Sequence, residues 1–124
     1  QSYNSNPLSL KSAIKNFDKI DSKNSQKYLL IGDMLDLGSH SKKLHQSIAP
    51  IINQTKIDKV FVKGKLASII FKNISKAKKG SILMNKSHIN KLIRKDLNNN
   101  DYLMIKASLA TGFNEIVKDL KGLR

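Results

Sequence analysis

The chain has 124 residues, the size of one ordinary domain, and 40% of them are apolar, so the composition is that of a folded protein. It contains no cysteine, which excludes disulfides, a thiolate nucleophile and Cys-based metal sites. The formal net charge of +14 favours anionic partners, and no apolar run approaches the roughly 20 residues of a membrane span, so we expect a cytoplasmic protein with no membrane partner.

The first expected helix begins at Asn6 and Pro7. An asparagine side chain can cap a helix, proline fits the first helical position, and apolar residues then recur at helical spacing up to Phe17. This pattern explains Asn6 and Pro7. It gives no role to Tyr3 and Asn4.

Short apolar runs then alternate with helical patterns along the rest of the chain. The expected strands are Tyr28 to Ile31, DKVFVKG (58–64), the weaker GSILMN (80–85) and DYLMIKAS (101–108). The expected helices are 41–54, bent by Pro50, then 66–74, a helix capped by Ser87, and a last helix with Phe113, Ile116, Val117 and Leu120 on one face; 98–100 forms a turn.

Strands that alternate with helices predict a mainly parallel sheet, because each strand must cross over through a helix before the next one. Right-handed crossovers place helices on both faces, so we expect a three-layer, Rossmann-like α/β domain over residues 1–124. The carboxyl ends of the strands then lie at one edge, where such folds bind ligands. The residues expected there are Gly32, Asp33, Lys63, Gly64, Asn85, Lys86 and 106–108.

The chain carries no motif for chemistry of its own. The P-loop and dinucleotide-binding patterns are absent, and the Gly-Lys pair at 64–65 is a fragment of the former. His40, His45 and His88 lack the spacing of metal ligands, so we expect no metal site. No catalytic residue is expected in this domain.

Four stretches resemble the carboxy-terminal domain of the Mur ligases. They are YNSNPLSLKSAI, YLLIGDMLDLGSHSKKLHQSI, DKVFVKG and DYLMIKASLATGFNEIVKDL, in the family's order. The resemblance runs from about Tyr3 to Leu120. It is strongest to the MurF type, which joins D-alanyl-D-alanine to UDP-N-acetylmuramoyl-tripeptide.

The resemblance implies an ATP-dependent amide ligase of peptidoglycan synthesis that works through an acyl phosphate. In such enzymes the P-loop and the Mg²⁺ ligands belong to a central domain, and an amino-terminal domain holds the UDP-sugar. The chain would then be the third domain of a larger enzyme. It would close over ATP against its own central domain and be inactive alone.

Tyr3, Asn4 and Asn6 match the family loop that lies along the nucleotide, and the resemblance implies that they contact ATP. Amide groups suit this role because they donate and accept hydrogen bonds without a charge. The alternative for Asn6 is a helix cap and nothing more. The family commonly has an acidic residue where Gln1 stands, which puts a ribose or magnesium-linked contact there in doubt.

By the same resemblance, Asp33 would meet the ammonium group of the incoming dipeptide, and Lys106 and Ser108 would face the acyl phosphate or the dipeptide carboxylate, where they would stabilise negative charge. The alternatives are a turn carboxylate for Asp33 and a solvated lysine for Lys106. Ala107 and Leu109 replace a glycine and a basic residue of the family.

Two other classes of protein remain open. The net charge would suit a basic α/β nucleic-acid-binding module, but the lysines are scattered, arginine occurs at Arg94 and Arg124 alone, and aromatic residues make up 6% of the chain. Lysine accompanies asparagine and isoleucine, which indicates AT-rich codon usage. A receiver-like interaction domain would have more than Asp33 and Asp36 as its acidic residues.

Overall fold

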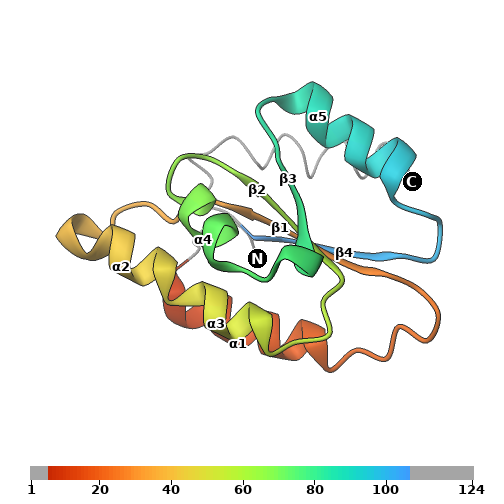
Figure 1. Cartoon of the computed structure of the whole chain (residues 1–124), viewed down its shortest axis with the longest axis horizontal. Coiled ribbons are helices and arrows are strands. Elements are labelled where there is room, and N and C mark those ends of the chain that lie inside the picture. Colours follow the sequence, from red (N-terminus) through yellow and green to blue (C-terminus); the bar gives the residue numbers. More distant parts are fainter. Residues whose placement is uncertain (1–5, 107–124) are drawn as a thin grey trace.

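The computed structural model describes residues 6–106, and a four-stranded sheet runs through them (Figure 1). The strand order is β3-β2-β1-β4, and every pair is parallel. The strands are β1 (Lys27–Gly32), β2 (Lys59–Lys63), β3 (Lys79–Ile82) and β4 (Tyr102–Lys106). The parallel sheet confirms the prediction from the alternation of strands and helices.

Five α-helices and three shorter helical segments lie within the described residues. The helices are α1 (Pro7–Asp18), α2 (Ser41–Gln46), α3 (Ile48–Asn53), α4 (Ala67–Asn73) and α5 (Lys86–Lys91), with η1 (Gly38–His40), η2 (Lys76–Lys78) and the π-helical η3 (Leu92–Asp96). None of them is long and apolar enough to cross a lipid bilayer. The expected last helix and Ser108 lie outside the described residues.

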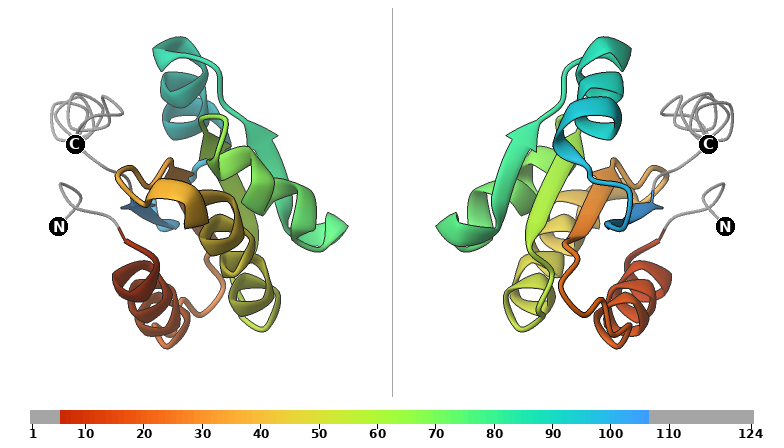
Figure 2. Two further views of the ribbon diagram at one scale, coloured as in Figure 1. Left: turned by 90° about the vertical axis from the view of Figure 1, so that its left-hand side faces the viewer. Right: turned by 90° about the vertical axis from the view of Figure 1, so that its right-hand side faces the viewer.

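Helices cover both faces of the sheet, so the expected three layers are present (Figure 2). One apolar cluster joins the sheet to α1, α3 and α4, and a second joins it to α5 and η3. Strand β1 contributes to both: Leu29 and Ile31 belong to the first cluster and Leu30 to the second. A strand buried on two faces needs apolar residues without alternation, which explains the Leu-Leu-Ile run.

The helical region over residues 41–54 is divided, as Pro50 predicts. Helix α2 ends at Gln46 and α3 begins at Ile48. Proline has no N–H to donate to the carbonyl four residues earlier, and that carbonyl belongs to Gln46. The break therefore lies at Ser47, one turn before the proline.

The cap expected at Ser87 is wrong. Asn85 caps α5, and its Oδ1 accepts a hydrogen bond of 3.0 Å from the His88 N–H. Strand β3 ends at Ile82, before the end of the expected strand, so the chain enters the helix earlier. Asparagine is among the best capping residues, and Ser87 then falls inside the first turn.

Lysine side chains link separate segments of the chain near the edge of the sheet where the strands begin. The Nζ of Lys27, a residue only 3% exposed, donates to the Asp18 carbonyl at the end of α1, at 2.7 Å. Lys59 donates to the Ala77 carbonyl at 2.9 Å. Lys78 donates to two carbonyls, those of Thr55 and Ile57, each at 2.7 Å.

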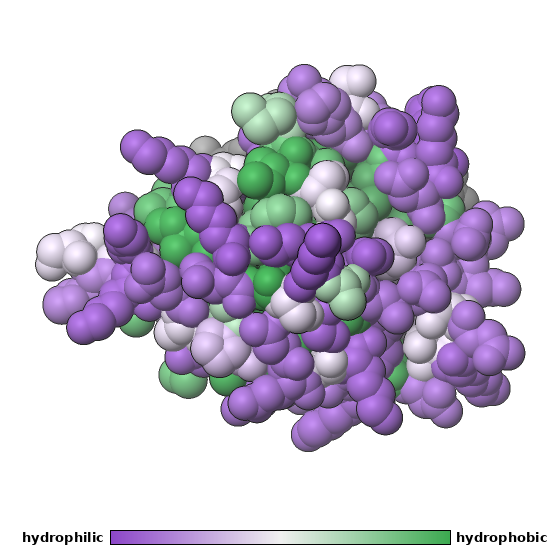
Figure 3. All heavy atoms as spheres, in the orientation of Figure 1, coloured by the Kyte–Doolittle hydropathy of each residue, from purple (hydrophilic) through white to green (hydrophobic). Residues whose placement is uncertain are grey.

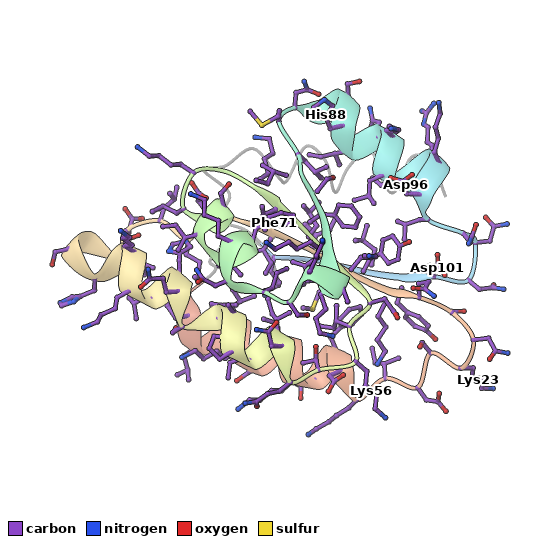
Figure 4. The ribbon with its side chains drawn as sticks, viewed as in Figure 1. Lys23, Lys56, Phe71, His88, Asp96 and Asp101 are labelled. Atoms are coloured by element: carbon purple, nitrogen blue, oxygen red, sulfur yellow. The ribbon has the colours of Figure 1, made fainter. Side chains whose placement is uncertain are left out.

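The turn before β4 is held to the start of β1 by Asp101, which Figure 4 labels. Its Oδ1 accepts from the Gln26 N–H and its Oδ2 from the Asn98 N–H, both at 2.9 Å. The expected turn over residues 98–100 is confirmed. One carboxylate thus sets where β4 meets β1.

Candidate functional site

The carboxyl ends of the four strands gather the polar residues that the sequence predicted there. Gly32 pairs with Lys63 on β2, and Ile31 pairs with Lys106 on β4. Neighbouring strands lie about 4.8 Å apart. Asp33, which follows Gly32, therefore leaves the sheet between two strand ends that each carry a lysine.

The carboxylate of Asp33 is held by the start of α4. Its Oδ1 accepts a 2.7 Å hydrogen bond from the Ala67 N–H, the first residue of that helix. Within residues 6–106, no hydrogen bond or ion pair reaches Oδ2. The side chain is half-buried, and Oδ1 is the oxygen that the described residues hold in place.

Gly64 makes room for this carboxylate. Its φ of +117° lies in the region that L side chains rarely adopt, and a Cβ there would overlap Asp33 Oδ1 and lie 2.8 Å from Oδ2. The chain therefore needs glycine at this position for two reasons. Sequence reasoning missed this contact, although a glycine directly after a strand was its signal.

His45 fixes the loop that follows Asp33. The side chain is fully buried, its Nε2 accepts from the Met34 N–H at 3.1 Å, and its Nδ1 lies 2.7 Å from the Ser41 carbonyl oxygen. These partners require a neutral ring with the proton on Nδ1, a tautomer inferred from the hydrogen bonds. These contacts give His45 a structural role.

A cavity of about 320 Å³ opens beside Gly64, between the start of α4 and the end of β3. It is lined by Lys63, Gly64, Lys65, Ser68, Ile82, Leu83 and Met84. On the face seen in Figure 3, apolar side chains are exposed within a surround of hydrophilic ones. Sequence reasoning placed the first two residues at this edge but did not predict the cavity.

Asn6 caps α1, since its Oδ1 accepts a 2.9 Å hydrogen bond from the Ser9 N–H. Its side-chain NH₂ group has no hydrogen bond within the described residues, and the residue is exposed. Tyr3 and Asn4 lie outside the described residues. The cap therefore occupies one half of the Asn6 amide and leaves the other half able to donate.

Metal-ligating side chains do not cluster in the part of the chain that the structure describes. No group of three or more His, Cys, Asp or Glu residues there could hold a metal ion. His88, labelled in Figure 4, accepts from the Met84 N–H at 3.1 Å through Nδ1. It therefore serves the turn into α5.

The model of one protein family, described as the glutamate ligase domain of Mur ligases, matches residues 1–109. The chain belongs to the Mur ligase family. A UDP-N-acetylmuramoyl-tripeptide–D-alanyl-D-alanine ligase of Bacillus subtilis (strain 168) is 32% identical over 121 residues, which are 95% of this chain and 26% of that protein. The ligase of the same name from Buchnera aphidicola (subsp. Acyrthosiphon pisum) is 31% identical over 120 residues, 95% of this chain and 25% of that protein.

Solved structures of Mur ligases share the fold. MurF of Thermotoga maritima in complex with ADP superposes with a TM-score of 0.74 at 22% identity, over 94% of this chain and 26% of that one. A structure of MurF from Acinetobacter baumannii gives 0.77 at 21% identity, over 96% and 26%. This Mur ligase chain thus spans about a quarter of the length of the relatives that it matches.

Proposed function

We propose that this chain is the third domain of an ATP-dependent ligase that adds D-alanyl-D-alanine to UDP-N-acetylmuramoyl-tripeptide in peptidoglycan synthesis. The observation that carries the proposal is the match to ligases of this name over 95% of the chain at 31% and 32% identity. In the reaction, ATP transfers its γ-phosphoryl group to the peptide carboxylate and leaves as ADP, and the dipeptide amine then attacks this acyl phosphate. An amide bond forms, phosphate leaves, and the amine loses a proton.

Asp33 is proposed to receive the ammonium group of the incoming dipeptide. Its Oδ2 has no partner within residues 6–106, and its Oδ1 is fixed by the Ala67 N–H, so the carboxylate is already oriented when the ligand arrives. A carboxylate held in place loses little side-chain entropy on binding. It follows β1 between two strands whose ends carry Lys63 and Lys106.

Lys106 and Ser108 are proposed to face the negative charge that develops during the reaction. A cation and a hydroxyl near the acyl phosphate stabilise that charge. Lys106 is the last residue of β4, at the same edge as Asp33. Tyr3, Asn4 and Asn6 are proposed to contact ATP, and the unused NH₂ of Asn6 gives that loop a donor.

The remaining parts of the site are proposed to lie on other domains of the parent enzyme. ATP would bring Mg²⁺, and we assign the Mg²⁺ ligands and the P-loop to a central domain that closes against this one. The UDP-sugar would be held by an amino-terminal domain. Because UDP-linked precursors and ATP are cytoplasmic metabolites, the enzyme is proposed to work in the cytoplasm.

The test compares the 124-residue chain with the full-length protein that carries it. Each is incubated with ATP, Mg²⁺, the UDP-linked tripeptide and D-alanyl-D-alanine, and both amide product and released phosphate are measured. We expect turnover by the full-length protein and none by the chain alone. Amide formation by the chain alone would contradict the domain assignment. If the full-length protein forms no amide product with the dipeptide, the proposed function is contradicted.

A further inference from the structure

The cavity beside Gly64 has a distinct charge character that the roles above do not use. Lys63 and Lys65 line it, and neither ammonium group has a hydrogen bond or ion pair with another described residue. Among the described residues, no carboxylate side chain lines it. Two unpaired cations beside one small cavity favour an anionic group as the occupant.

The opposite wall of the cavity is apolar. Ile82 is 38% exposed and Met84 is 69% exposed. Leu83 between them is buried and anchors this wall to the sheet through a 2.7 Å hydrogen bond from its N–H to the Val62 carbonyl. Covering this wall with a small aliphatic group removes apolar surface from water.

Gly64 links the cavity to the Asp33 carboxylate. Gly64 is one of the lining residues, and the Asp33 carboxylate lies where a Gly64 side chain would otherwise be. Two positive groups therefore border the cavity, and one negative group lies behind Gly64, outside the lining. This arrangement matches a small zwitterion, with its ammonium group toward Asp33 and its carboxylate toward Lys63 and Lys65.

The volume also fits a ligand of this kind. Small-molecule pockets usually measure about 300 to 1,000 Å³, and this cavity, at about 320 Å³, is at the low end. The Ser68 hydroxyl donates to the Gly64 carbonyl at 2.7 Å, and this hydrogen bond holds the connection from β2 to α4. This side of the cavity is therefore in place before a ligand binds.

We propose that Lys63 and Lys65 bind the carboxylate of the incoming D-alanyl-D-alanine, whose methyl groups lie against Ile82 and Met84. This inference rests on the proposed function. It assigns the carboxylate end of the dipeptide to the β2 side of Asp33. Lys106, on the β4 side, keeps its proposed place facing the acyl phosphate.

The experiment uses the full-length protein with the variants Lys63→Gln and Lys65→Gln. The matched control is Lys72→Gln, which removes an exposed lysine from the last turn of α4 without touching the cavity. Each protein is assayed with D-alanyl-D-alanine and with D-alanyl-D-alanine amide, in which a neutral carboxamide replaces the carboxylate. Binding of each compound is also measured by calorimetry, which does not depend on turnover.

For the dipeptide, we expect each cavity variant to raise KM and Kd about tenfold with little change in kcat, the factor expected from one charge-assisted hydrogen bond. For the amide, the variants and the parent protein should have the same KM and Kd. Equal effects on both compounds, or no effect beyond that of Lys72→Gln, would overturn the inference while leaving the function intact. If the parent protein does not use the dipeptide as a substrate, both this inference and the proposed function are contradicted.

Discussion

Replacing Gly64 with alanine tests whether the Asp33 carboxylate is held in the way described. A methyl group at this position would overlap the carboxylate, and the backbone φ of +117° would be strained for any L residue. Gly38 provides the matched control. Its φ is +64°, and a Cβ there would have nothing within 4 Å.

The expected magnitudes differ because only one substitution displaces a side chain. Placing alanine in a left-handed conformation costs about 1 to 2 kcal/mol at either glycine. At Gly64 the displaced carboxylate also loses its hydrogen bond to the Ala67 N–H, worth about 1.5 to 3 kcal/mol for a charged acceptor. We therefore expect Gly64→Ala to lower the free energy of unfolding by about 2.5 to 5 kcal/mol, and Gly38→Ala by about 1 to 2 kcal/mol.

Equilibrium urea unfolding of the two variants and the parent protein measures these free energies. The change in unfolded-state entropy is common to both Gly→Ala substitutions and cancels in the comparison. In the Asp33→Ala background there is no carboxylate for the new methyl group to overlap. Adding Gly64→Ala to Asp33→Ala should therefore lower the free energy of unfolding by much less than Gly64→Ala lowers it in the parent protein. Equal losses at Gly64 and Gly38, or additive effects in the double variant, would refute this account of the contact.

Three further outcomes are expected. His45→Leu should lower the free energy of unfolding by about 1 to 3 kcal/mol in urea, because it leaves the Met34 N–H buried without an acceptor, and His45→Gln should restore part of that loss. Burial and nearby carboxylates raise the pKa of Tyr28 above its ordinary 10.0. The neutral phenol therefore contributes to folding stability below pH 10, and this contribution is lost as the pH rises through the higher folded-state pKa. An absorbance titration of the folded protein should show this late-ionising phenol, and the Tyr28→Phe variant should lack it. Asn6→Ala and Asn85→Ala should each cost about 1 kcal/mol as lost helix caps, and in the full-length protein only Asn6→Ala should weaken ATP binding; equal ATP affinities would reduce Asn6 to a cap.

Hydrophobic pattern was sufficient to predict the fold because both faces of the sheet are covered. The Leu-Leu-Ile run of β1 has no polar alternation, and this is the pattern that burial between two helical layers requires. Pro50 marked the helix break through its missing N–H. The cap of α5 could not be placed from Ser87 and Asn85 alone, since both are good caps and only the end of β3 decides between them.

The candidate site was predictable only as far as topology reaches. Parallel strands bring their carboxyl ends together, so Asp33, Lys63 and Lys106 could be placed at one edge from the order of elements. The contact between Asp33 and Gly64 needs a backbone conformation and a helix start 34 residues away, which no local pattern specifies. The cavity depends in the same way on how α4 packs beside β3.

The lysines at the amino-terminal edge change how the charge of the chain should be understood. The ammonium groups of Lys27, Lys59 and Lys78 donate hydrogen bonds to peptide carbonyls and so link separate segments of the chain. The three ammonium groups keep their charge within the total of +14, but a polyanion would have to compete with these carbonyls for them. Some lysines of this lysine-rich chain thus stabilise the fold. A count of basic residues therefore overstates the number that can contact RNA or DNA directly.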